Sequence, residues 1–251
     1  MTIDFSKQNN IYEKKALVYA LYERFNQTFG NYVDLNIVKE GLNNVEKMTK
    51  DVGLGISAYQ EDDKIYVKDD VDINTFFHEV LHYVTREHNG MAYSLVGAYS
   101  DEEFDNCCRE FGQDRFVKQI AMLDESFTTF ITELAIPETD YTNLYEFGTN
   151  FLRKYYSALI NNGIDTSFLF TMYFNEDPVI GLKFKESFGS KFKELIDTIE
   201  KSNNAQYIGK IIREQRKNPS LTADDIIGKK LTEEEIDNLI EESINNMKTR
   251  S

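Results

Sequence analysis

Apolar and polar residues follow a helical period over the N-terminal part of this chain. Apolar side chains recur at helical spacing from Tyr12 to Phe29, and Gly30 follows as a natural stop. Asp34 has the character of an N-cap and predicts a second helix that runs to about Met48. The N-terminal segment is therefore expected to consist of two helices.

The period changes between residues 54 and 68. Apolar residues lie on both sides of the polar turn Glu61-Asp62-Asp63, a pattern that predicts a β-hairpin. A helical period resumes after Asp72 and continues as far as Asn89-Gly90, which is a strong stop signal. We therefore expect a small sheet followed by a helix.

Helical patterns dominate the rest of the chain. They cover residues 101–110, 114–136, 141–162, 165–174, 178–201, 204–217 and 231–248. Pro137, Pro178 and Pro219 lie between these segments or at the start of one, where proline is compatible with a helix boundary. The last of them begins with a capping box from Thr232 to Glu235. The expected fold class is α+β and mostly helical, with residues 1–136 forming a lobe that contains a small antiparallel sheet and residues 137–251 forming a helical C-terminal lobe.

Composition and charge narrow the choice of partners. The 251 residues are 41% hydrophobic, which is ample material for a buried core. They carry 28 Lys and Arg against 43 Asp and Glu, a formal net charge of −15, so the average surface repels phosphate backbones and anionic headgroups. We therefore expect no nucleic-acid partner and no membrane partner, while the oligomeric state stays undetermined.

Cysteine usage and the N-terminal sequence bear on the compartment. The only two cysteines, Cys107 and Cys108, are adjacent, which provides no disulfide framework. No apolar leader follows the N-terminus and no run of about 18 apolar residues occurs. The default expectation is a cytoplasmic protein, and this pattern leaves a signal-independent export route open.

The segment His78-Glu79-Val80-Leu81-His82 contains the pattern HExxH. Histidines four residues apart lie on one face of a helix, so both imidazoles can reach a single tetrahedral Zn²⁺. Glu79 lies beside them and can accept a proton from a water in the site. Only three histidines occur in the chain, and two of them fall in this pattern.

A helical wheel supports this interpretation. Thr75, His82 and Thr85 fall on the same stripe as His78, whereas the apolar residues of the helix gather on the other side. Histidines that only filled a core would be expected among the apolar residues. The pattern therefore favours a helix that packs on one face and presents two metal ligands on the other.

Two candidates compete for the third ligand. His88 has the spacing of HExxHxxGxxH, but Thr85 stands where that motif has its glycine. Glu125 lies on a later helix, flanked by Ala121, Thr129 and Thr132 and opposite a strong apolar face. Its direction and its small, hydroxyl-bearing neighbours favour Glu125. Other glutamates, Glu110 and Glu133, are weaker substitutes, and Asp124 and Thr129 are candidates for orienting the histidines.

At these residues the chain resembles the gluzincin metallopeptidases, in which HExxH on one helix is completed by a glutamate from a later helix. The likeness rests on HExxH and on Asp124-Glu125-Ser126, which is similar to the Asn/Asp-Glu-Gly pattern of that family with serine in place of glycine. It covers roughly residues 54–136. The resemblance implies a zincin-like catalytic domain in which His78, His82 and Glu125 bind Zn²⁺ and Glu79 activates water for peptide hydrolysis.

The same resemblance implies that extended substrate pairs with a strand that precedes the histidine helix, and residues 64–68 are the expected edge. Tyr155 and Tyr156 lie on a suitable later helix for stabilising an oxyanion, but packing is the better explanation for either residue in a chain with fifteen tyrosines, and the role stays unassigned.

Two alternatives stay open. A metzincin-like peptidase would use His88 as the third ligand, and a non-catalytic zinc-binding or protein-interaction domain would keep the motif for structure. Retention of Glu79 argues against the latter, because a structural site needs no base between its ligands. The sequence therefore predicts a zinc metallopeptidase that acts on a peptide or protein substrate.

Overall fold

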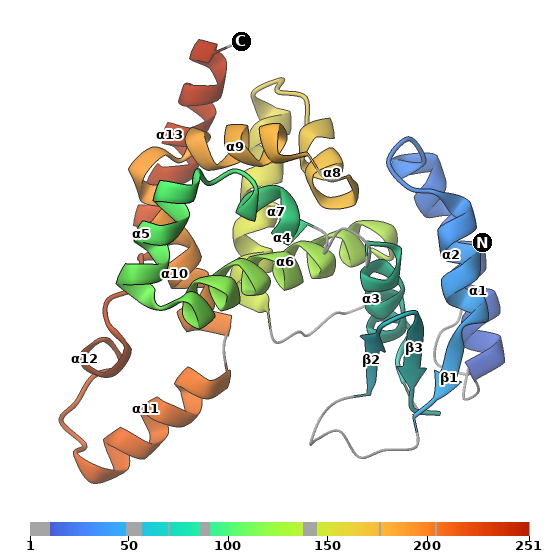
Figure 1. Ribbon diagram of the computed structural model, residues 1–251, viewed down its shortest axis with the longest axis horizontal. Helices are drawn as coiled ribbons and strands as arrows, with labels where there is room; N and C mark the ends of the chain where they lie inside the picture. Colours follow the sequence, from blue (N-terminus) through green and yellow to red (C-terminus); the bar gives the residue numbers. More distant parts are fainter. Residues whose placement is uncertain are drawn as a thin grey trace.

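The computed structural model in Figure 1 describes residues 11–48, 57–69, 71–85, 91–137, 145–175, 177–203 and 205–250. In chain order the elements are α1 (Ile11–Phe29), α2 (Leu35–Asn43), β1 (Val45–Lys47), β2 (Ala58–Glu61), β3 (Lys64–Val67), α3 (Ile73–Val84), α4 (Met91–Val96), α5 (Asp101–Phe111), α6 (Gln113–Ala135), α7 (Glu146–Asn161), α8 (Ser167–Phe174), α9 (Pro178–Ser187), the 3-10 turn η2 (Gly189–Lys191), α10 (Phe192–Asn203), α11 (Ala205–Lys217), α12 (Ala223–Ile227) and α13 (Glu233–Arg250). The protein is therefore mostly helical with one small sheet, as the sequence predicts.

The sheet has three strands in the order β1-β3-β2. β2 and β3 form the predicted hairpin, with Ala58 opposite Val67 in antiparallel register, while residues 54–56 lie outside the described residues. β1 was not expected. It pairs parallel to β3, with Val45 opposite Ile65, so the sheet is mixed and the prediction of an antiparallel sheet was incomplete.

The second predicted helix is shorter than expected because its continuation joins this sheet. α2 ends at Asn43, and the amide of Asn44 donates to the carbonyl oxygen of Glu40 at 3.0 Å. The next residues then form β1. A short strand of this kind, with one half-buried and two exposed residues, carries no alternating apolar pattern that would reveal it.

The strand order also corrects the expected substrate-binding edge. Residues 64–67 form the central strand β3, which is paired on both sides, so they offer no edge. The outer strands of this sheet are β1 and β2. Any added strand would therefore pair with one of these two strands and not with β3.

One face of the sheet packs against α3, which in turn contacts α1, α2 and α6. Ala58, Ile65 and Val67 are buried on this face, whereas the rings of Tyr59 and Tyr66 stack on the other face with centroids 4.9 Å apart. The apolar side of α3 completes the core with Ile73, Phe76, Phe77, Val80, Leu81 and Val84. The amphipathic pattern predicted for this helix is thus confirmed.

The long helix α6 lies at the centre of the molecule (Figure 1). It packs against α3 and against α4, α5, α7 and α10. α6 therefore connects the sheet-associated helix α3 to the C-terminal helices. The expected domain boundary near residue 136 stays a prediction.

The C-terminal helices agree with the sequence within a few residues, with one break, and residues 141–144 at the predicted start of α7 lie outside the described residues. The helix predicted over residues 178–201 divides into α9 and α10 at Phe188 and Gly189, where Gly189 adopts the left-handed region at φ 56°. Two short helices, α4 and α12, were not predicted. The predicted capping box of α13 is present, since the amide of Glu235 donates to Thr232 Oγ1 at 3.2 Å.

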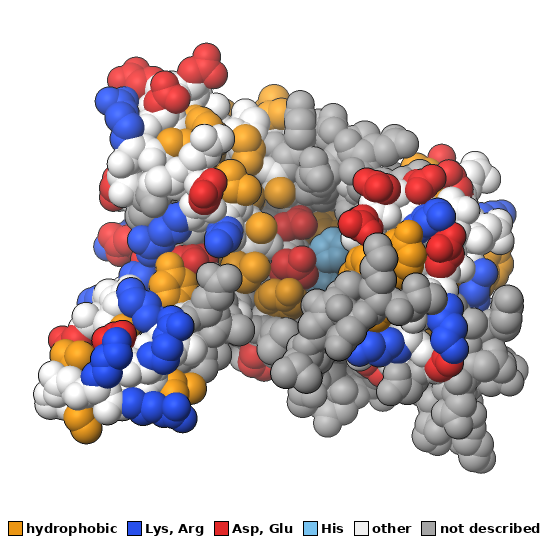
Figure 2. Space-filling view, turned by 60° about the horizontal axis from the view of Figure 1, so that its bottom comes forward, with side chains coloured by type: hydrophobic (Ala, Val, Ile, Leu, Met, Phe, Trp, Pro, Cys, Tyr) orange, Lys and Arg blue, Asp and Glu red, His pale blue; other side chains and the backbone are white. Residues whose placement is uncertain are grey.

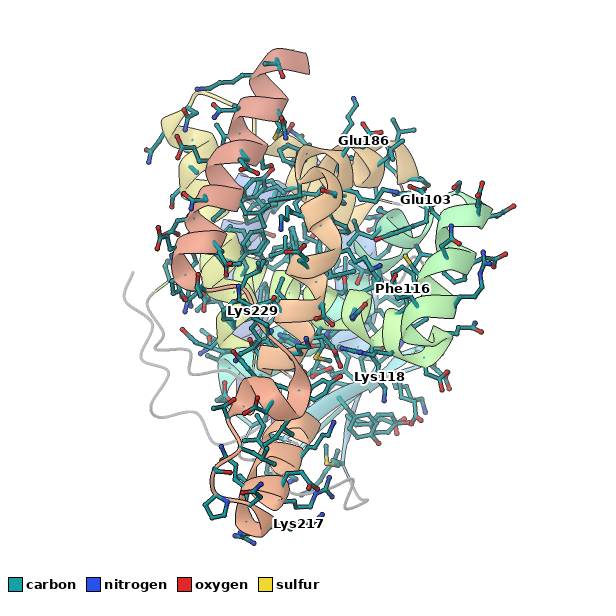
Figure 3. The ribbon with its side chains drawn as sticks, turned by 90° about the vertical axis from the view of Figure 1, so that its left-hand side faces the viewer. Glu103, Phe116, Lys118, Glu186, Lys217 and Lys229 are labelled. Atoms are coloured by element: carbon teal, nitrogen blue, oxygen red, sulfur yellow. The ribbon has the colours of Figure 1, made fainter. Side chains whose placement is uncertain are left out.

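Figures 1 and 3 show α11 projecting from the body of the helical part, with Lys217 near its end. None of the helices that the structure describes combines the length and apolarity needed to cross a bilayer.

Candidate metal centre

Helix α3, which carries both histidines, begins with a side-chain cap at Asp72. The amide of Thr75 donates to Asp72 Oδ1 at 2.9 Å, and the Thr75 hydroxyl donates to Asp72 Oδ2 at 2.5 Å. One turn later His78 and His82 project from the side of α3 that is opposite to its apolar core face. His78 is buried, and His82 is half-buried.

Glu125 comes from the middle of α6. Its helix buries Ile120, Leu123, Phe127 and Phe130 on the opposite side, as the sequence predicts. Ser126, which stands where the gluzincin pattern has glycine, turns away from the histidines. Its hydroxyl donates to the carbonyl oxygen of Met122 at 2.7 Å and accepts from Asn203 Nδ2 at 3.1 Å, so serine leaves the path from Glu125 to the histidines open.

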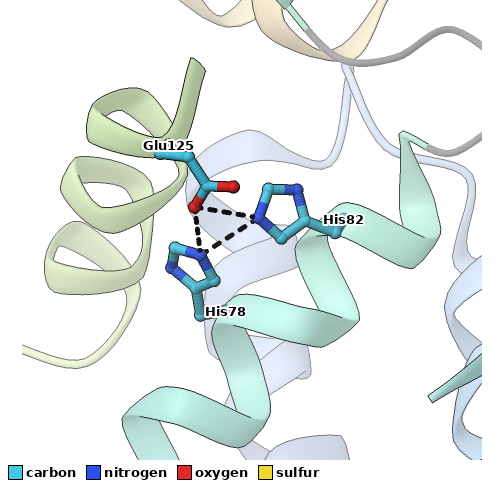
Figure 4. Close-up of side chains that lie close together, drawn as sticks. All are labelled: His78, His82 and Glu125. Atoms are coloured by element: carbon cyan, nitrogen blue, oxygen red, sulfur yellow. Dashed lines mark hydrogen bonds and ion pairs between the residues drawn. The ribbon is translucent and has the colours of Figure 1, made fainter. Parts of the chain in front are cut away.

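The three predicted ligand residues meet between α3 and α6 (Figure 4). The Nε2 atom of His78 lies 3.1 Å from Glu125 Oε2 and 3.0 Å from His82 Nε2. The third side of this triangle, from His82 Nε2 to Glu125 Oε2, measures 3.4 Å. Three atoms that can each donate a lone pair therefore converge on one point.

This triangle has the size of a zinc coordination face. Zinc bonds of about 2.0–2.1 Å in tetrahedral geometry place neighbouring ligand atoms about 3.3 Å apart. The observed sides of 3.1, 3.0 and 3.4 Å agree with this spacing. Two imidazoles and one carboxylate are also a donor set that zinc accepts, and three protein ligands leave a fourth position for water or substrate. The residues present therefore fit Zn²⁺.

The electrostatics of the site favour a cation at this place. Burial favours the neutral imidazole of His82, but the charge and hydrogen bond of Glu125, together with the charges of Glu79 and Asp124, outweigh burial and raise its pKa to about 9. Burial likewise opposes ionisation of Glu125, yet the neighbouring His82 and His78 lower the pKa of this carboxyl well below its ordinary value. Glu125 is therefore an ionised carboxylate that attracts positive charge.

The remaining predicted site residues are distributed as follows. Glu79, the predicted base, is half-buried on α3, close enough for its charge to act on His82. His88, the alternative third ligand, lies outside the described residues.

The weaker candidates for the third ligand and the two tyrosines considered for the oxyanion role make contacts with other residues. Glu133 accepts from Arg153 Nε at 2.8 Å, and Glu110 pairs with Lys193. The hydroxyl of Tyr155 contacts Ser243 Oγ at 3.3 Å inside the helical part. Tyr156 packs against Phe130 with ring centroids 5.4 Å apart. These contacts leave Glu125 as the carboxylate that joins the histidines.

A pocket of about 460 Å³ opens beside His82 and Glu125. Its lining comes from the hairpin, from α3 and the residue that ends it, from α4 and from α6, namely Gln60, Asp62, His82, Thr85, Ala92, Ala121, Asp124 and Glu125. Figure 2 shows a histidine surface at the bottom of a hollow with acidic side chains next to it. The pocket is thus lined by small residues and carboxylates.

The sequence did not indicate several neighbours of the site. Tyr145 precedes α7, and its ring is nearly parallel to that of His78, with centroids 6.3 Å apart. The opposite ring nitrogen of His78, Nδ1, is buried and has no hydrogen-bond partner within the described part of the chain. Gln60 and Asp62 reach the pocket from the hairpin. No periodicity in the sequence reports such contacts, because they depend on how distant elements pack.

No protein-family model matches the sequence, and neither a curated protein nor a solved structure matches this chain. A function for the chain is therefore inferred from the geometry of this centre.

Proposed function

We propose that the chain is a zinc-dependent peptidase of the gluzincin type with a zincin-like catalytic domain. The observation that carries this proposal is the convergence of His78 Nε2, His82 Nε2 and Glu125 Oε2 from two helices, with Glu79 next to the first histidine. A site that only held zinc for structure would usually be closed by a fourth protein ligand. Within the described residues the group has three members, which supports a catalytic site.

Bound zinc would supply a Lewis acid that polarises the scissile carbonyl and acidifies the attacking water towards a pKa of about 7. The protein supplies the proton transfers. Glu79 takes a proton from the attacking water and hands it to the departing amide nitrogen. His78, His82 and Glu125 hold the centre in place between α3 and α6.

The outer strand β2 offers the substrate a place to bind in extended form. A peptide that adds to the exposed edge of a sheet gains main-chain hydrogen bonds, and alternate side chains enter pockets. Gln60 belongs to β2 and lines the pocket next to His82 and Glu125. A peptide on this edge would therefore run past the metal ligands.

The pocket beside the ligands favours a cationic side chain. Asp62 at the hairpin turn and Asp124 on α6 place two carboxylates in its lining in addition to the ligand Glu125. The small residues Ala92 and Ala121 leave room for a long side chain. A lysine or arginine next to the scissile bond would place its charge among these carboxylates.

Digestion of a peptide library by the zinc-loaded protein tests the function. We expect cleavage by the wild type and a loss of at least about 100-fold in rate for Glu79→Gln, because this change removes the base and keeps the shape of the side chain. Elemental analysis of the same samples should show about one zinc per chain in both proteins. Cleavage that survives Glu79→Gln, or a wild type without zinc after reconstitution, would overturn the proposal.

A further inference from the structure

A second, basic pocket of about 340 Å³ lies between α6, α10 and α11. Its lining consists of Asp114, Arg115 and Lys118 from α6, Glu200 from α10, and Tyr207, Lys210 and Arg213 from α11. Most of these side chains are cationic, whereas the charged residues that line the pocket beside His82 and Glu125 are acidic apart from the histidine. The two pockets therefore differ in the sign of their charge.

Ion pairs occupy the buried side of the basic pocket. Arg115 Nη2 lies 2.7 Å from Asp197 Oδ1, and Arg115 Nε lies 3.6 Å from Glu200 Oε2. Glu200 is buried and also accepts from the hydroxyl of Tyr207 at 3.1 Å. These contacts balance the charge of Arg115 and join α10 to both α6 and α11.

The other three cations of the basic pocket are exposed and have no such contacts. Within the part of the chain that the structure describes, the side chains of Lys118, Lys210 and Arg213 form neither a salt bridge nor a hydrogen bond. Asp114 is the remaining acid in the lining. The cationic charge exceeds the charge of this carboxylate, so the pocket attracts anionic groups.

Helix α11 concentrates positive charge in a chain that is acidic overall. Its residues include Lys210, Arg213, Arg216 and Lys217 but a single acid, Glu214. The whole chain carries a formal net charge of −15. Figure 2 shows Lys and Arg side chains gathered on the projecting part of the molecule where Figure 1 places α11. An acidic ligand is therefore repelled by the average surface and attracted at this place.

The two pockets lie on the same side of α6. Asp114, Lys118, Ala121 and Glu125 follow one another at intervals of four, three and four residues, which places them on one stripe of the helix. Asp114 and Lys118 line the basic pocket, whereas Ala121 and Glu125 line the pocket at the candidate metal centre. A polypeptide that leaves the metal centre along this stripe therefore meets the basic pocket next.

The spacing along α6 gives the length of chain that joins the two pockets. Lys118 precedes Glu125 by seven residues and Asp114 precedes it by eleven, which corresponds to about 10 Å and about 17 Å along the helix axis. An extended peptide advances about 3.3 Å per residue. Residues about three to five positions from the scissile bond therefore reach the basic pocket.

We propose that the basic pocket binds an acidic segment of the substrate polypeptide through Lys118, Lys210 and Arg213, about three to five residues from the bond that is cleaved. This inference rests on the proposed peptidase function. Together with the acidic pocket at the metal centre, it describes a substrate that has a cationic residue next to the scissile bond and acidic residues further along the chain.

Two peptides that differ only in the acidic segment test this substrate class. Both carry lysine next to the scissile bond, and one has aspartates at the third to fifth positions where the other has asparagines. We expect the wild type to cleave the acidic peptide with about tenfold higher kcat/KM at low salt, and this ratio to fall as added salt screens the exposed charges. Because the basic pocket lies in one direction from the metal centre, the preference should appear for aspartates on one side of the scissile bond only.

Two double variants of α11 separate the basic pocket from general surface charge. Lys210→Gln/Arg213→Gln removes two cations of the pocket and should lower the ratio to about twofold. Arg216→Gln/Lys217→Gln is the matched control, because it also removes one lysine and one arginine from α11, at positions that do not line the pocket. Figure 3 shows Lys217 at the outer end of this helix. The control should keep the wild-type ratio.

Fluorescence anisotropy of the labelled acidic peptide with Glu79→Gln protein provides a readout that does not depend on turnover. The affinity should fall when Lys210 and Arg213 are replaced in this background and should stay unchanged when Arg216 and Lys217 are replaced. Lys118→Gln, on the α6 side of the pocket, should also weaken binding.

Equal effects of the two double variants, or equal cleavage of both peptides by the wild type, would overturn the basic pocket as a substrate site and leave the peptidase proposal standing. A zinc-loaded wild type that cleaves neither these peptides nor any member of a peptide library would overturn both proposals.

Discussion

The Nε2 atom of His78 lies 3.1 Å from Oε2 of Glu125, although 47 residues separate them in the chain. A mostly buried imidazole and a carboxylate are costly to bring together unless they compensate each other or share a cation. Removal of one partner therefore leaves the other uncompensated. Zinc content and the pH dependence of stability in such variants distinguish a metal site from an ordinary ion pair.

Glu125→Ala should abolish stoichiometric zinc binding, because the proposed site loses one of its three protein ligands. Glu133→Ala is the matched control: Glu133 lies on the same helix and pairs with Arg153, so this variant should retain zinc. His88→Ala should retain zinc as well. Elemental analysis of the purified variants is the measurement. Zinc that disappears with His88 and persists without Glu125 would instead support the metzincin-like alternative.

The metal-free protein should lose stability as the pH rises from about 6.5 to about 9. Against the effect of burial, Glu125 and the weaker charges of Glu79 and Asp124 raise the pKa of His82 from 6.5 to about 9 in the folded state. Folding is therefore favoured by the bound proton below pH 6.5, and this contribution is lost as the pH passes the folded pKa. Melting temperatures measured over this pH range in the presence of a chelator check the predicted loss of stability. Glu125→Gln should reduce the dependence of the melting temperature on pH, and an unchanged dependence in that variant would contradict the role of the carboxylate.

Asp62→Asn should reduce the preference for a cationic side chain next to the scissile bond. A partly exposed charge pair contributes about 1 kcal/mol at most, so we expect a loss of roughly fivefold in kcat/KM for a lysine-containing peptide and little change for its alanine counterpart. Asp63→Asn is the control, since Asp63 belongs to the same turn but is not among the residues that line the pocket. Equal effects of both substitutions would point to general surface charge.

Gly148→Ala should destabilise the fold by about 1–3 kcal/mol, because a methyl group there would lie 2.1 Å from Ser126 Oγ where α7 crosses α6. Gly209→Ala, also within a helix, meets no atom within 4 Å and should stabilise by up to about 1 kcal/mol. Thermal unfolding compares the two. Ser126→Gly in the Gly148→Ala background removes the two closest atoms and should restore part of the stability, whereas no recovery would show that the crossing is not the cause.

Local signals in the sequence were sufficient to predict most helices and the helix faces on which His78, His82 and Glu125 lie. Asp72 caps α3 and the Thr232–Glu235 box opens α13, because side chains three residues apart satisfy amides that the helix leaves unpaired. The helical period also placed His78 and His82 on one side of α3 and Glu125 opposite the apolar face of α6. Such features depend on neighbours within one or two turns, so they can be read from the chain alone.

Tertiary packing decided the rest. Strand β1 exists because β3 offers it hydrogen bonds, and the break at Gly189 separates α9 from α10 where the prediction had one helix. The pairing of His78 with Glu125, the entry of Asp62 into the pocket and the contact of Tyr173 with Thr128 join residues from different elements. Amphipathic patterns show which face of a helix is buried but not which element covers it, since many partners satisfy the same apolar face. The sequence by itself therefore determined which residues are suited to bind a metal, and only the folded structure decided that they meet.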